Sequence, residues 1–98
     1  MPTLSEYTNV YNTALIVIEQ KGYQAWYDKQ AEMFCAEKDG WDFMAESPVG
    51  LLGLISIFEF KKPEKYGEYW WRERGRDLYG ELPRKPKPYR SVLERDED

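Results

Sequence analysis

Residues 33–46 decide the fold, and they read MFCAEKDGWDFMAE. Asp39-Gly40 stands between two apolar-containing runs, and a two-residue type I′ turn requires residues that tolerate positive φ at both central positions. The stretch therefore predicts a β-hairpin. The turn also fixes the register, because the residues that flank it must face each other. The expected cross-strand pairs are Lys38 with Trp41, Ala36 with Phe43, and Phe34 with Ala45.

Alternation along the two strands assigns one face of this hairpin to the core and the other to solvent. The residues expected on the core face are Phe34, Ala36, Trp41, Phe43 and Ala45. The opposite face, which we expect to be wetter, carries Cys35, Glu37, Asp42, Met44 and Glu46.

A helix is expected directly after the hairpin. Ser47-Pro48 pairs an N-cap hydroxyl with proline at the first helical position, and the helix should run from Pro48 to about Lys61, before Pro63. Apolar residues surround this segment almost completely, which is typical of a helix buried on most sides. The side chains expected to be nearly inaccessible are Leu51, Leu54, Ile55 and Phe58.

Before the hairpin, a capping-box pattern from Thr3 to Glu6 predicts that a helix occupies residues 4–21. Its apolar stripe would consist of Leu4, Tyr7, Tyr11, Ala14, Leu15 and Ile18. The alternative is a strand over residues 14–18, because β-branched residues favour strands. Residues 23–28 change period and are rich in aromatics, which favours a short strand.

A third, shorter helix is expected over residues 63–73. From Leu82 to Arg90 the chain has three prolines and four basic residues, which favours an extended, polyproline-like segment. The sequence thus predicts a single α+β domain over residues 1–75, with an N-terminal helix, a small antiparallel sheet, a buried central helix and a short third helix. Residues 76–98 would form an extended tail rich in Pro, Arg and Lys with an acidic end.

The composition excludes most familiar enzyme classes. The chain has 98 residues and no histidine, so it lacks the usual neutral-pH acid/base and the usual zinc ligand. Phosphate-loop and dinucleotide motifs are absent as well. We therefore expect no catalytic, metal-binding or cofactor-binding residues. The longest apolar run, residues 49–58, is shorter than the ~20 residues of a membrane span, and the single cysteine favours the cytoplasm.

Two groups of side chains could still carry chemistry. The carboxylates Asp39, Asp42 and Glu46 lie close together in sequence, but they fit a turn and a solvated strand face better than a metal site or an acid/base pair. Cys35 has no histidine to activate it, so we expect a space-filling thiol.

Residues 66–76 concentrate Trp, Tyr and Arg, the residue types that dominate protein interfaces. Adjacent tryptophans on a helix point about 100° apart, so one of Trp70 and Trp71 is expected outside the core. The alternative is that both pack against the tail. The candidate binding residues, with two carboxylates of the acidic first sixty residues, are Asp42, Glu46, Tyr69, Trp70, Trp71, Arg72 and Arg74.

Charge is segregated along the chain. Residues 1–60 carry nine acids and three bases, whereas residues 61–95 carry six acids and eleven bases. In composition the chain resembles small bacterial immunity proteins, and that resemblance implies an inhibitor that neutralises a basic protein. We therefore expect a non-enzymatic protein-binding module, with neither membrane nor nucleic acid as a partner. The alternatives are a self-associating protein, such as a homodimer, and a small enzyme that uses carboxylates.

Overall fold

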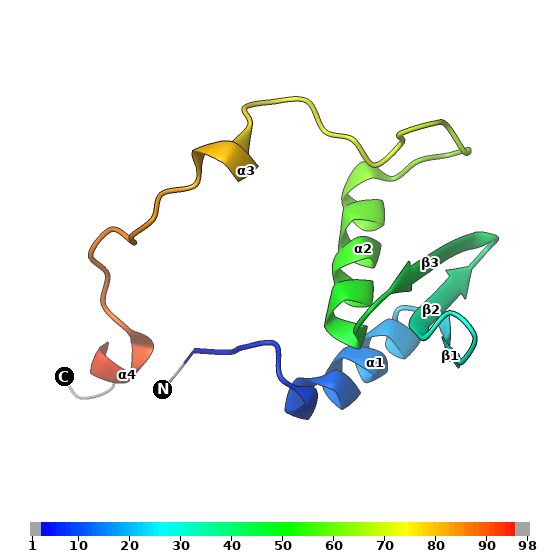
Figure 1. The fold of residues 1–98 in the computed structure, drawn as a ribbon, viewed down its shortest axis with the longest axis horizontal. Coiled ribbons are helices and arrows are strands. Elements are labelled where there is room, and N and C mark those ends of the chain that lie inside the picture. Colours follow the sequence, from blue (N-terminus) through cyan, green and yellow to red (C-terminus); the bar gives the residue numbers. More distant parts are fainter. Residues whose placement is uncertain (1–2, 96–98) are drawn as a thin grey trace. The chain divides into compact units, whose positions relative to one another are not determined.

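A computed structural model describes residues 3–95, and these residues fall into two units. The larger unit, Glu6–Arg72, holds the core and confirms the α+β class. Its elements are a 3-10 turn η1 (Thr8–Val10), α1 (Tyr11–Gln20), β1 (Gln24–Asp28), β2 (Met33–Lys38), β3 (Trp41–Ala45) and α2 (Pro48–Lys61). The three strands form an antiparallel sheet in the order β1-β2-β3 (Figure 1).

The hairpin and its register are confirmed. Asp39 and Gly40 have φ values of 53° and 88°, as a type I′ turn requires at its two central positions. All three expected pairs are present, and the turn places Lys38 opposite Trp41. The strand expected within residues 23–28 is also present and pairs antiparallel with β2.

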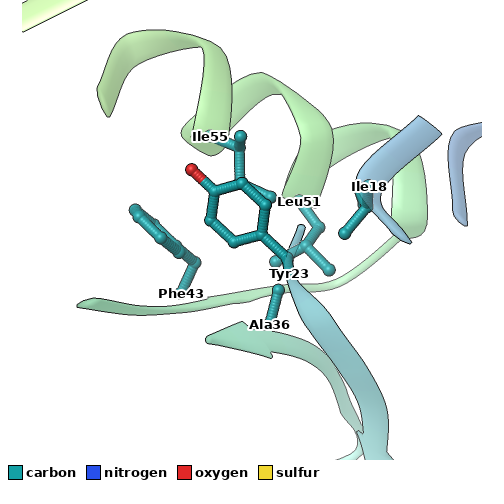
Figure 2. Close-up of a cluster of buried hydrophobic side chains, with 6 residues drawn as sticks. All are labelled: Ile18, Tyr23, Ala36, Phe43, Leu51 and Ile55. Atoms are coloured by element: carbon teal, nitrogen blue, oxygen red, sulfur yellow. The ribbon is translucent and has the colours of Figure 1, made fainter. Parts of the chain in front are cut away.

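The core lies between the two helices and one face of the sheet. Ile18 of α1 and both Leu51 and Ile55 of α2 are fully buried against Ala36 and Phe43, as Figure 2 shows. The remaining residues predicted for this face, Phe34, Trp41 and Ala45, are partly buried and pack against the same cluster. The face assignment made from the turn is therefore confirmed.

Cys35 corrects the expectation for the opposite face of the sheet. That face is wet at Asp42 and Met44, but Cys35 is only 3% exposed. It sits on the central strand, directly between Trp26 of β1 and Met44 of β3. The larger neighbouring side chains on either side cover the small thiol.

The first helix begins later than the sequence predicted. Residues 3–7 are irregular, and α1 starts at Tyr11 without a side-chain cap. The capping box fails because the Glu6 carboxylate instead accepts a hydrogen bond from the Ser47 hydroxyl, at the start of α2. Leu4 and Tyr7 are consequently exposed, whereas Ala14 and Ile18 are buried. The choice of a helix over a strand for this segment is confirmed.

The Ser47 cap of α2 is confirmed, since its hydroxyl accepts a hydrogen bond from the Gly50 amide at 2.9 Å. Burial around the helix is less complete than expected. Leu51 and Ile55 are buried, Phe58 is half-buried, and Leu54 is 37% exposed. The expectation of an inaccessible Leu54 is therefore wrong, because within the Glu6–Arg72 unit no third helix covers that side of α2.

The helix expected over residues 63–73 does not form. Lys62 ends α2 in the left-handed region at φ 48°, and Tyr69 also has a positive φ of 58°. Residues 62–72 therefore form no helix and contain one turn, at residues 68–71. The second unit contains two helical turns, α3 (Leu78–Glu81) and α4 (Val92–Arg95), and residues 82–91 between them have no regular structure. The acidic residues 96–98 lie outside the described part of the chain.

None of the helices within residues 3–95 combines the length and the apolar character that a membrane span requires.

Replacing Gly40 with valine should destabilise the hairpin by about 1–3 kcal/mol, because a β-branched residue resists positive φ. The space around Gly40 is open, so the effect is purely conformational. Gly53→Ala is the matched control: it also meets open space but lies inside α2, where alanine should stabilise by about 0.5–1 kcal/mol. Urea unfolding measures both, and equal effects would contradict the turn assignment.

Truncation along α2 should separate its buried side from its exposed side. Leu51→Ala should cost about 2–5 kcal/mol of unfolding free energy, because it leaves a cavity among fully buried neighbours. Leu54→Ala should cost well under half as much, since a third of that residue already meets solvent. A Leu54→Ala variant as unstable as Leu51→Ala would show that this side of the helix belongs to the core.

Candidate protein-binding groove

An apolar hollow lies in the Glu6–Arg72 unit between β3, α2 and the turn that follows α2. It has a volume of about 420 Å³. Its lining residues come from all three segments and include Asp42, Met44, Leu54, Ile57, Trp70 and Trp71. We call this hollow the β3–α2 groove. It lies on the side of α2 where Leu54 and Ile57 are exposed.

The walls of the β3–α2 groove are apolar and accessible. Met44 is 48% exposed, Ile57 43% and Trp71 50%, and Leu54 adds a fourth partly exposed side chain. Exposed apolar residues are ordinary when they are scattered, but a contiguous concave group of them marks a binding surface. Asp42 is the single charged residue among those that line it.

The two adjacent tryptophans have different environments. Trp70 packs edge-on against Trp41 at 5.5 Å and against Phe58 at 5.8 Å between ring centroids, so it extends the core. Trp71 instead leaves half of its surface in solvent at the groove wall. Tyr69, which has a positive φ, directly precedes the two tryptophans in this turn, and their side chains point in different directions. Trp71 is therefore the accessible member of the pair.

Arg72 is held by aromatic rings. Its guanidinium lies 4.6 Å from the centroid of Tyr69 and 5.7 Å from that of Trp71. The two rings also contact each other edge-on at 5.9 Å. This three-residue stack orders Tyr69 and Trp71 beside the groove, because a cation over an aromatic face is attractive.

The other candidate residues are placed less centrally. Glu46 is exposed just after β3 and does not line the groove, and Arg74 belongs to the second unit. Asp39 and Asp42 both line a neighbouring hollow that also includes Lys65. Within residues 3–95, no group of three or more acidic or cysteine side chains is arranged to hold a metal ion.

Sequence reasoning missed the apolar part of this surface. The sequence assigned Leu54 to the core, gave no separate position to Ile57, and did not place Trp26 on the open sheet face. The register provides the missing signal for that face, because Trp26, Cys35 and Met44 form one cross-strand row. On α2, the almost all-round apolar pattern does not distinguish the buried Leu51 from the exposed Leu54.

Burial raises the pKa of the Cys35 thiol above its usual 9.0, and the charges of Asp28 and Asp42 raise it further. Burial also raises the pKa of Tyr23, with Glu59 and Asp39 adding to the effect. In both cases the folded protein keeps its proton to a higher pH than the unfolded chain does. The contribution of each neutral group to stability is therefore fully present below its unfolded pKa and is lost as the pH rises from there through its higher folded pKa.

We expect the melting temperature to fall as the pH rises above about 9, since the unfolded thiol and then the unfolded phenol ionise first. Cys35→Ala should remove the early part of this fall and Tyr23→Phe the later part. Tyr79→Phe is the control, because Tyr79 is 93% exposed. Thermal unfolding over a pH series tests this, and identical alkaline profiles for all four proteins would contradict it.

Comparisons with known proteins supply no precedent for the groove. The chain matches no family model, no curated protein and no solved structure.

Proposed function

We propose that this chain is a non-enzymatic module that binds another protein through the β3–α2 groove. One observation carries the proposal: Leu54, Ile57, Met44 and Trp71 form a concave apolar surface that the rest of the Glu6–Arg72 unit does not fill. A small domain gains stability by covering such side chains, so leaving them accessible in one place suits a surface that a partner covers.

The composition of the groove favours a protein as the partner. Its rim holds Trp71 with Tyr69 and Arg72, and Trp, Tyr and Arg are the residues that most often dominate binding energy at protein interfaces. The surface area of the hollow is much smaller than the area of a standard interface, in which each partner buries about 800 Å². It would therefore serve as the anchoring centre of a larger contact.

The charge of the chain favours a basic partner. Asp42 lies in the groove and Glu46 is exposed just beyond β3, within a first sixty residues whose net charge is -6. Opposite charge accelerates encounter, while apolar anchors slow dissociation. An inhibitor that neutralises a basic protein fits this combination. Its location would be the cytoplasm, where the single thiol stays reduced.

The test is affinity capture of the tagged protein from its own host, with Trp71→Ala and Tyr79→Ala in parallel. We expect one basic protein at equal stoichiometry with the wild type and with Tyr79→Ala, which alters an exposed ring outside the groove. Trp71→Ala should stay folded, because Trp71 is half exposed, and should lose at least about 2 kcal/mol of affinity.

Raising the salt from about 0.05 M to about 0.5 M should slow association with the captured partner and leave dissociation nearly unchanged. Two results would contradict the proposal. One is a protein that elutes as a dimer with no partner, which identifies self-association. The other is turnover of a substrate that is lost in Asp42→Asn or Glu46→Gln.

A further inference from the structure

The outer edge of β3 offers unpaired backbone groups. In a turn, the carbonyl of the first residue accepts a hydrogen bond from the amide of the fourth, so Lys38 and Trp41 form a hydrogen-bonded pair. Such pairs alternate along an antiparallel ladder. Phe43 and Ala45 therefore bond to β2, whereas the amides and carbonyls of Asp42 and Met44 point away from the sheet.

No other segment of the Glu6–Arg72 unit bonds to these groups. β3 is a terminal strand in the order β1-β2-β3, and no backbone hydrogen bond within residues 3–95 joins Asp42 or Met44 to a turn or loop. Both residues also line the β3–α2 groove. The free strand edge and the apolar hollow are therefore one continuous surface.

We propose that an extended peptide segment of the partner, with alternating basic and apolar side chains, pairs as an added strand with the free edge of β3. This inference rests on the proposed function and specifies its ligand. The added strand would bond to the backbone of Asp42 and Met44, as in other complexes formed by β-strand addition.

The alternation of basic and apolar side chains in the proposed peptide follows from the two faces of the sheet that meet at the edge of β3. Successive residues of an added strand point to opposite faces of the sheet. One set would enter the groove beside Leu54, Ile57 and Trp71, where apolar side chains fit. The other set would lie on the open face, next to the side chains of Asp42 and Met44.

The open face of the sheet favours basic side chains at the peptide positions that lie on it. Asp42 lies at the edge, Glu37 is opposite it on β2, and the exposed Glu46 follows β3. No lysine or arginine occupies an open-face position of any of the three strands. The raised pKa of Cys35 agrees with this, since Asp42 and Asp28 impose a negative potential at the centre of the face.

The same charges argue against a second copy of this chain as the added strand. Pairing of two β3 edges would bring the Asp42 carboxylates of both copies to one open face. Like charges in neighbouring cross-strand positions are destabilising. A basic segment from a different protein has no such penalty.

The experiment uses the full chain and synthetic peptides in which lysine and valine alternate. Binding is followed by calorimetry, against a peptide of equal composition with its lysines and valines in separate blocks. Two further peptides carry backbone N-methyl groups, one on every lysine and the other on every valine. An added strand presents only alternate amides to β3, so one methylated peptide should lose at least about tenfold in affinity and the other should not.

Loss on methylation of the lysines identifies antiparallel pairing, and loss on methylation of the valines identifies parallel pairing. Asp42→Asn should weaken the alternating peptide severalfold, whereas Glu19→Gln, an exposed change on α1, should not. Equal affinity of the alternating and block peptides, equal effects of the two methylations, or no binding of the alternating peptide would each overturn strand addition. If Trp71→Ala still weakens capture of the natural partner in that case, the proposed function survives alone.

Discussion

The two-residue turn at Asp39-Gly40 determines how the sheet is paired and, through the pairing, which side chains reach the core. Both residues adopt positive φ, and a two-residue turn of this type allows only one register between β2 and β3. A slip of one residue would carry Phe43 from the core to solvent and Asp42 from solvent to the core. The same register determines which backbone groups of β3 point outward. Core, open face and free edge are therefore consequences of one turn.

Much of the core could be predicted because its signals are local. The turn pair and the Ser47 cap act within a few residues, and both are found where the sequence indicates them. The failures involve contacts between distant residues. Glu6 accepts a hydrogen bond from Ser47 rather than capping its own helix, and Cys35 is covered by side chains of two neighbouring strands. No local pattern encodes such contacts.

The candidate site was predictable in its residue types but not in its shape. The concentration of Trp, Tyr and Arg indicated an interface, yet a helical turn was expected where Tyr69 adopts a left-handed conformation. The two residues that follow Tyr69 then differ in burial: Trp70 packs against the core, whereas Trp71 remains accessible. Residues 62–72 do not form the expected helix, and Trp70 and Trp71 of this segment line the groove together with Leu54.

The open edge of β3 beside the β3–α2 groove can be observed in the unliganded protein by amide hydrogen exchange. We expect fast exchange at Asp42 and Met44, and exchange at least about a hundredfold slower at Phe43 and Ala45, whose amides bond to β2. Equal protection of all four amides would show that the edge of β3 is already covered and is not a binding surface.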